Sequence, residues 1–440
     1  MPDDRVPLNH ERSRALYRRA CATMPGGSSR TSVYESPFPI YAESGAGAYV
    51  ADVDGNRYLD FTNNFTTLIH GYGHPAITAA LLAQVPRGTS FGNPTESEIE
   101  LAEMLCERVS GFEHIRFTNT GSEAVMMAVR ASRARNGRPK VAKCEGAFHG
   151  SFDAVEVSYD SGPENWGVHD PARVPYNRGT PAQVLQQTVV LPFNDLANTE
   201  RILAAEADEL ACIVIDPMPA RAGLIPVEHE YLAFLREFTR RHGILLISDE
   251  VLNFRLTYEG AMTHFGVEAD LCTFGKIIGG GMPIGAIAGR ADIMSVFDPS
   301  RGKPAVPQSG TFTANPLSMV AGAAAMRAMT REAFARLNAL GDTAREGLRG
   351  AISQSSVSAQ VTGLGSLFQI KLNDRKLRGY RDQYPSPDER AQLAQLVQIV
   401  RERGVLISST GLGALSTPMT SADIDTLVAA VKRGLKEIAP

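Results

Sequence analysis

The strongest constraint on the fold is an alternation that runs from residue 114 to residue 290. Short apolar runs, typical of buried strands, are separated by longer segments in which apolar residues recur with helical spacing. Helices are expected from Ser122 onward and over residues 230–241. Strands joined by helices in this way form βαβ units, whose strands lie parallel in one sheet. The sequence therefore predicts an α/β fold, with strands at residues 114–118, 140–144, 212–216, 244–249 and 270–274.

The length of 440 residues exceeds a typical single core, and two domains are expected. After Pro316 the pattern predicts a long helical stretch to about Asn338, followed by helices mixed with short strands at residues 368–372 and 405–408. This tail has the pattern of a smaller α+β domain, which the N-terminal segment would join. The expected division is an N-terminal segment at residues 1–65, a large domain at residues 66–325 and a small domain at residues 326–440.

Charge and apolar content argue against several classes of function. The net charge of −4 arises from scattered residues, so no basic surface for nucleic acid is expected. Every apolar stretch is far shorter than the ~20 residues that span a membrane, and the N-terminus lacks the apolar core of a signal peptide, so a cytoplasmic protein is expected. The five cysteines are widely spaced and form no C-x-x-C pair, which favours reduced thiols over a zinc site.

Three polar groups follow strands of the expected sheet, at the edge where α/β sheets bind ligands. Gly121 and Ser122 open a helix, whose free N–H groups and dipole attract a phosphate; a plain capping box is the alternative. Asp249 ends an apolar strand, where it needs a cationic partner, either a ligand or an ordinary salt bridge. Lys276 precedes a run of glycines, and partial burial would make its amine a nucleophile, unless the side chain extends into solvent.

A single ligand accounts for all three groups. Pyridoxal 5′-phosphate (PLP) carries a phosphate, a ring nitrogen that a carboxylate keeps protonated, and a carbonyl that reacts with an amine. The glycines after Lys276 let the backbone pass close to such a cofactor. PLP is therefore the expected cofactor, and no metal is expected.

Five motifs in a fixed order resemble those of class III aminotransferases, in particular the glutamate-1-semialdehyde aminomutase-like branch. They are Thr-Gly-Ser-Glu-Ala at 120–124, Gly-Ala-Phe-His-Gly at 146–150, Asp-Glu-Val at 249–251, Phe-Gly-Lys at 274–276 and Gly-Thr-Phe-Thr-Ala-Asn-Pro at 310–316. The resemblance extends from about residue 25 to residue 423. It implies fold type I of the PLP-dependent transferases, with a mostly parallel seven-stranded sheet flanked by helices in the large domain and a smaller α+β domain.

The resemblance also implies roles for individual residues. Lys276 would bind the cofactor covalently and transfer protons, and Asp249 would pair with the ring nitrogen. A homodimer with shared active sites follows, because one cofactor contact would come from the other subunit. The remaining cofactor-binding residues would be Gly121 and Ser122 at the phosphate, Phe148 and Val251 on the two ring faces, His149 beside the ring or in a structural role, and Thr311 at the partner's phosphate.

Arg30 and Asn64 are the predicted substrate-binding residues. Residues 25–33 are similar to β-amino-acid aminotransferases, in which the matching arginine holds the substrate carboxylate. The planar fork of an arginine suits this task, and an ion pair with a neighbouring acid is the alternative. Those enzymes have a second arginine for the keto acid near the segment 407–416, which contains none here. Arg221 and Arg255 are the candidate substitutes.

The predicted function is that of a PLP-dependent aminotransferase. Such an enzyme moves an amino group from an amino acid, with β-amino acids among the candidates, or from an amine to a keto acid or other carbonyl acceptor by a ping-pong mechanism. An aminomutase of the glutamate-1-semialdehyde 2,1-aminomutase type, or a racemase, would keep every motif. Net transfer of an amino group between two compounds separates these alternatives.

Overall fold

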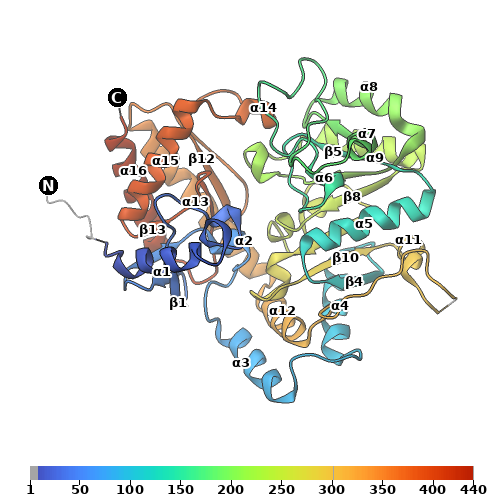
Figure 1. The fold of residues 1–440 in the computed structure, drawn as a ribbon, viewed down its shortest axis with the longest axis horizontal. Coiled ribbons are helices and arrows are strands. Elements are labelled where there is room, and N and C mark those ends of the chain that lie inside the picture. Colours follow the sequence, from blue (N-terminus) through green and yellow to red (C-terminus); the bar gives the residue numbers. More distant parts are fainter. Residues whose placement is uncertain (1–7, 301, 440) are drawn as a thin grey trace.

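The computed structural model describes residues 8–300 and 302–439. A seven-stranded sheet with strand order β4-β10-β9-β8-β7-β5-β6 forms its centre (Figure 1). The strands β9, β8, β7, β5 and β6 are parallel to one another, and β10 is antiparallel to both of its neighbours. All five strands expected from the alternation are present, together with β6 and β10. The bounds are β4 (His114–Thr118), β5 (Lys140–Cys144), β6 (Thr188–Leu191), β7 (Leu210–Ile215), β8 (Leu245–Asp249), β9 (Leu271–Gly275) and β10 (Gly285–Gly289).

Helices cover both faces of this sheet, which explains why its parallel strands are apolar throughout. Along β7, Cys212 and Val214 pack with the core on the side of α5, whereas Ile213 and Ile215 pack with the core on the side of α9. The helices are α3 (Pro75–Gln84), α4 (Glu96–Arg108), α5 (Gly121–Asn136), α6 (Asp153–Glu156), α7 (Ala182–Gln187), α8 (Leu196–Glu206), α9 (His229–His242), α10 (Ala261–His264), α11 (Ala291–Met294) and α12 (Pro316–Ala328).

Two small sheets and their helices form the other side of the molecule, where the blue and red ends of the chain lie together (Figure 1). One sheet has the order β1-β2-β3-β13 and the other the order β11-β12-β14. Strand β3 pairs in parallel with β13, which joins the start of the chain to its end. The domain boundaries at residues 65 and 325 stay a prediction. The elements are α1 (Glu11–Cys21), β1 (Ala42–Ala46), β2 (Tyr49–Asp52), β3 (Arg57–Asp60), α2 (Asn63–Thr66), α13 (Arg331–Ser353), β11 (Gln360–Thr362), β12 (Leu367–Lys371), α14 (Tyr380–Gln383), α15 (Pro387–Glu402), β13 (Val405–Leu406), β14 (Leu412–Ala414) and α16 (Ser421–Glu437).

The helical stretch expected after Pro316 is present, and it is divided into two helices, α12 and α13. Met329 leaves the helical conformation with φ −89° and ψ 74°. Thr330 then caps α13, since its side chain accepts a hydrogen bond from the N–H of Ala333. Apolar residues continue across this break, so the spacing alone did not reveal it.

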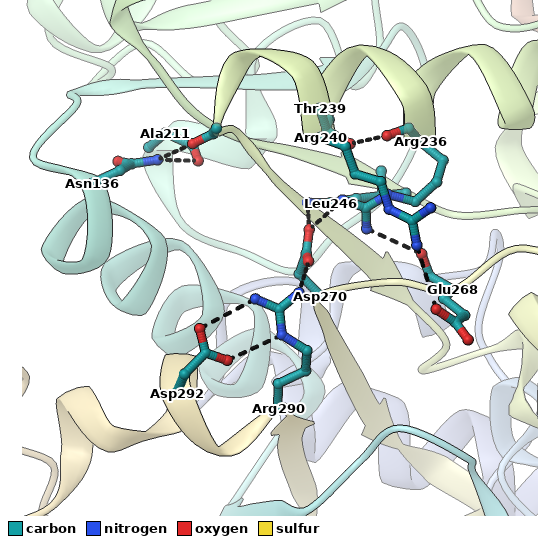
Figure 2. A network of polar contacts seen from close by, with 11 residues as sticks. Asn136, Ala211, Arg236, Thr239, Arg240, Leu246, Glu268, Asp270, Arg290 and Asp292 are labelled. Atoms are coloured by element: carbon teal, nitrogen blue, oxygen red, sulfur yellow. Dashed lines mark hydrogen bonds and ion pairs between the residues drawn. The ribbon is translucent and has the colours of Figure 1, made fainter.

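A buried ionic network lies at the amino-terminal ends of the parallel strands, opposite the predicted ligand site (Figure 2). Asp270 precedes β9, is 3% exposed, and accepts hydrogen bonds from Arg236 of α9 (2.9 Å) and from Arg290 after β10 (3.0 Å). It also accepts from the N–H of Leu246 in β8 (2.8 Å). Each charge of the buried Arg236–Asp270 pair offsets the cost of burying the other. The network therefore ties α9 to three neighbouring strands.

Candidate active site

The structure brings the segments that carry the predicted cofactor residues together at the carboxyl edge of the sheet. Close packing at three glycines allows this. A Cβ on Gly121 would lie 2.8 Å from the side chain of Val251, and a Cβ on Gly275 would lie 3.2 Å from it. A Cβ on Gly150 would lie 2.5 Å from the hydroxyl of Ser122. The start of α5, the loop after β5 and the ends of β8 and β9 therefore meet at one place.

The start of α5 is capped and still open to an anion. The side chain of Thr120 accepts a hydrogen bond from the N–H of Glu123 at 3.1 Å, so the capping alternative is present. This cap does not use the N–H groups of Gly121 and Ser122, and no carbonyl within the helix can reach them. The hydroxyl of Ser122 accepts from the N–H of Ser151 (3.1 Å), which ties the loop after β5 to the helix. Open N–H groups and the helix dipole suit a phosphate.

Asp249 at the end of β8 and His149 in the loop after β5 form a buried pair. Their side chains lie 2.7 Å apart, between Nδ1 and Oδ2, and the residues are 4% and 1% exposed. Burial lowers the pKa of His149, so the neutral ring donates its Nδ1 proton to the carboxylate. The other carboxylate oxygen accepts from the Thr273 hydroxyl (3.0 Å) and the Val251 N–H (3.1 Å). Three protein donors therefore fix the direction of the carboxylate.

Lys276 follows β9 directly, and its amine lies near Asp249 and Asp216. The residue adopts a left-handed conformation with φ 49° and is only partly exposed. Burial lowers the pKa of the Lys276 amine, although Asp249 and Asp216 act in the opposite direction. A lowered pKa increases the share of the unprotonated amine, which is the nucleophilic form.

The remaining predicted cofactor residues differ in their surroundings. Phe148 is 47% exposed and its ring contacts Tyr159, with 5.2 Å between the ring centroids. Val251 is partly buried between Gly121 and Gly275. Thr311 is exposed in the loop before α12, and within the described residues no hydrogen bond joins it to the other site residues. Close contacts therefore join Val251 to the start of α5 and to the end of β9.

Arg30 and Asn64 are exposed and contact each other. The Nη1 of Arg30 donates to Oδ1 of Asn64 at 3.1 Å, and the guanidinium carbon lies 5.7 Å from the centre of the Phe65 ring. In the part of the chain that the structure describes, no acid pairs with Arg30. The ion-pair alternative is therefore not observed, and the charge of Arg30 is left for a ligand.

The two arginines considered for the keto acid lie in different environments. Arg255 is fully buried, and its guanidinium donates to two backbone carbonyls and one hydroxyl. It is not accessible to a substrate, so this candidate was wrong. Arg221 follows β7, is partly exposed, forms an ion pair with Asp160 and lies 4.7 Å from the centre of the Tyr159 ring. Arg221 stays a candidate.

Sequence reasoning missed Thr273 and Asp216. Thr273 is the register partner of Asp249 across β8 and β9 and donates to its carboxylate. Asp216 follows β7 directly, where burial raises its carboxyl pKa to about 8. Its side chain accepts hydrogen bonds from Asn253 and from the N–H of Met218. Asp216 carries the signal that identified Asp249, a polar group at the end of an apolar strand, whereas Thr273 lies within β9 and carries no such signal.

The arrangement fits PLP group by group. The open start of α5 suits the phosphate, the oriented carboxylate of Asp249 suits a protonated ring nitrogen, and the amine of Lys276 suits the carbonyl. The second nitrogen of His149 is buried without a partner among the described residues. At the close-packed glycines the site is lined by backbone rather than by side chains, which leaves room for the cofactor.

The fold and the site together define the class of protein, a PLP-dependent enzyme with an α/β sheet. The chain belongs to the class III aminotransferase family, whose family model matches residues 31–433. The family and the fold class predicted from the sequence are thereby confirmed.

Three known proteins illustrate the similarity. A glutamate-1-semialdehyde 2,1-aminomutase of Methanothermobacter thermautotrophicus is 39% identical over 397 residues, which cover 90% of this chain and 91% of that protein. A structure described as a transaminase with PLP bound is 47% identical, with a TM-score of 0.92 over 98% of each chain. A β-phenylalanine aminotransferase from Variovorax paradoxus is 33% identical, with a TM-score of 0.87 over 96% of this chain and 93% of that chain.

Proposed function

We propose that the protein is an aminotransferase that moves an amino group from an amino acid or amine to a keto acid or other carbonyl acceptor in two half-reactions. The observation that carries the proposal is Lys276, a partly buried amine with a lowered pKa at the end of the strand beside Asp249. Such an amine is a nucleophile toward a carbonyl group. The cofactor is PLP, which supplies when bound an electron-poor ring that accepts electrons from the substrate carbon.

The protein's own residues would orient the cofactor and move one proton. Asp249, held by His149 and Thr273, would keep a proton on the ring nitrogen. Lys276 would hold the cofactor covalently and, as a free amine, would take the proton from the substrate carbon and deliver it to the cofactor carbon. The proposed cofactor-binding residues are Gly121, Ser122, Phe148, His149, Asp249, Val251, Lys276 and, from a second copy, Thr311.

The amino donor is proposed to carry a carboxylate, with β-amino acids as the first candidates. Arg30 supports this proposal, because its only polar side-chain partner among the described residues is the neutral amide of Asn64. A guanidinium with donors to spare binds a carboxylate through two parallel hydrogen bonds. The relative named as a β-phenylalanine aminotransferase supports the same class of donor.

A homodimer with shared active sites is also proposed. Helix α3 projects from the body of the molecule (Figure 1), and it and the following segment expose several apolar side chains. Phe312, next to Thr311, is 63% exposed. Contiguous exposed apolar groups favour association, and a second copy would cover them. The exposed side chains of the α3–α4 region are Leu82, Val85, Phe91 and Ile99.

No other macromolecular partner is proposed. Within residues 8–300 and 302–439, no helix is long and apolar enough to cross a membrane. The cytoplasmic location and the absence of nucleic-acid binding stay predictions from the sequence.

An aminomutase is the second candidate function, because a curated relative is named glutamate-1-semialdehyde 2,1-aminomutase. The same residues would serve an amino group that moves within one molecule. The two functions differ in their products. An aminotransferase turns an amino donor into a carbonyl compound and aminates a second carbonyl compound, whereas an aminomutase isomerises one substrate.

The first experiment follows the visible absorbance of the PLP-loaded protein after addition of β-phenylalanine without an acceptor. The expected result is loss of the yellow colour with release of one keto product per site, and recovery of the colour on addition of a keto acid. A protein that stays yellow with all amino acids, and isomerises glutamate-1-semialdehyde, would support the aminomutase. A protein that takes up no PLP would contradict both functions.

Lys276→Ala tests the central residue. The variant is expected to retain PLP through the phosphate and ring contacts, and to lose at least about 100-fold in turnover, because both the attachment and the proton transfer are removed. Borohydride reduction followed by peptide mass spectrometry should fix PLP to residue 276 of the parent protein and to no residue of the variant. Full turnover by Lys276→Ala would contradict the assignment.

A further inference from the structure

Helix α2 is a left-handed turn built from four residues that are not glycine. Asn63, Asn64, Phe65 and Thr66 have φ values of 47°, 48°, 55° and 71°. Side chains with a Cβ clash with the backbone in this region, so residues other than glycine usually adopt it singly, with asparagine the most tolerant. A run of four that includes phenylalanine and threonine persists only where the surroundings impose it.

The surroundings impose it through three anchors. The carboxylate of Asp60 accepts the N–H of Asn63 at 3.2 Å, and the side-chain amide of Asn63 donates to the carbonyl of Ala414 at 2.6 Å. At the other end, Nη1 of Arg255 donates to the carbonyl of Thr66 at 3.1 Å. The turn itself leaves two buried atoms without partners among the described residues, Oδ1 of Asn63 and Oγ1 of Thr66.

Arg255 is an unusual anchor, because it is a buried cation to which no acid in the described residues is bonded. Its other donors reach the hydroxyl of Ser366 (3.0 Å) and the carbonyl of Leu415. Burial lowers the pKa of Arg255 to about 9, because the charged form is disfavoured away from water. Because this buried charge binds only carbonyls and a hydroxyl and pairs with no acid, its role is to hold these groups in place.

The turn presents two side chains to Arg30. Asn64 and Phe65 are exposed, one accepting from its guanidinium and the other lying under it. A right-handed turn would direct these side chains elsewhere, because the Cβ direction depends on φ and ψ. The backbone strain therefore sets the direction of the guanidinium before any substrate arrives.

Resting on the proposed function, we propose that the left-handed turn 63–66 is a preorganised platform that aims Arg30 at the carboxylate of the amino donor, and that Arg255 is the positioning residue that holds the turn. The platform selects donors with a carboxylate over plain amines. Preorganisation raises affinity because the side chains are already ordered before binding.

The first test measures binding of 3-phenylpropanoate, a carboxylate without an amino group, to the PLP-loaded protein by calorimetry. Arg255→Met is expected to weaken this binding, and to raise KM for β-phenylalanine, by about tenfold. Because the charge of Arg255 also lowers the pKa of Lys276, the effect is read from two donors, and the ratio of the KM for β-phenylalanine to the KM for 1-phenylethylamine, which lacks a carboxylate, should rise about tenfold. Arg255→Lys, which keeps the charge and one donor, should recover part of the binding.

Asn64→Asp supplies an independent variant in case Arg255→Met does not fold. It keeps a residue that tolerates the left-handed conformation and places a carboxylate on Arg30, so 3-phenylpropanoate should bind at least about tenfold more weakly. Unchanged binding in Asn64→Asp would overturn the platform.

The strain is tested without any ligand. Phe65→Gly should melt at a higher temperature than Phe65→Ala, because both lose the ring and only glycine adopts this conformation without a Cβ clash. Equal melting temperatures would overturn the left-handed turn.

Failure of the proposed donor class is distinguishable from failure of this inference. If the parent protein binds no 3-phenylpropanoate and Arg30→Ala changes nothing, the carboxylate-bearing donor is wrong. If Arg30→Ala abolishes binding and a folded Arg255→Met does not weaken it, only the role of Arg255 is wrong.

Discussion

At the scale of single residues, Asp216 shows how burial sets the protonation of this site. Its carboxyl has a pKa of about 8, chiefly because it is buried and secondly because Asp249 lies near. In the unfolded chain an aspartate titrates near pH 4. The folded protein therefore holds a proton on Asp216 that the unfolded chain releases between these two values, and stability is lost as the pH rises through this window.

Asp216→Asn is expected to stabilise the cofactor-free protein in a pH-dependent way. The free energy of unfolding should equal that of the parent near pH 4 and exceed it progressively up to about pH 8, by at most about 1.4 kcal/mol per pH unit, and the difference should then level off. Urea denaturation across this range measures it. Asp208→Asn, at an exposed position, controls for the loss of one negative charge. A difference that does not vary with pH would contradict the prediction.

The residues of the candidate site were partly predictable. Asp249 and Lys276 were found because each charged residue follows an apolar strand, and such strands end at one edge of a parallel sheet. The pairing of His149 with Asp249 was not predictable from the residues alone, since the two are far apart in the sequence and only the fold brings them within 2.7 Å. Thr273 was missed because a threonine in a strand is ordinary by composition.

At the scale of elements, the alternation predicted those strands that are rich in large apolar residues. Strand β10 was missed, since its sequence Gly-Ala-Ile-Ala-Gly lacks β-propensity. Tertiary packing requires these small residues, because a Cβ on Gly285 would collide with the carbonyl of Thr120. Helix α2 was equally hidden, because Asn-Asn-Phe-Thr has no pattern that distinguishes a left-handed turn from an ordinary loop.

The network around Asp270 makes a prediction at this scale. Asp270→Ala should lower the free energy of unfolding by about 3–5 kcal/mol, because it leaves the buried guanidinium of Arg236 without its carboxylate. Glu237→Ala is the matched control, since it removes an exposed ion pair with Arg241 and should cost less than about 1 kcal/mol. Urea denaturation measures both. Because the network lies at the ends of the strands opposite Lys276, the KM of the folded Asp270→Ala variant should be unchanged. Equal losses of stability in Asp270→Ala and Glu237→Ala would refute the prediction.

At the scale of the whole molecule, the exposed apolar face of α3 predicts a dimer on which the cofactor depends. Leu82→Asp combined with Val85→Asp should yield a monomer by light scattering. It should also weaken PLP retention, because the proposed contact of Thr311 from a second copy with each phosphate would be lost. Val168→Asp, at a still more exposed apolar position in a loop, should leave the dimer intact. A parent protein that is monomeric with full activity would contradict the shared site.

The pairing of β3 with β13 has a consequence for synthesis on the ribosome. Strand β3 is made early, yet its parallel partner is among the last segments of the chain to emerge. Domains generally fold as units during translation, and pairings between distant segments form slowly. The strands of the seven-stranded sheet are complete well before that, so β3 must wait with an unpaired edge while the rest of the chain is translated. This interval exposes the nascent chain to misassembly until β13 is available to pair with β3.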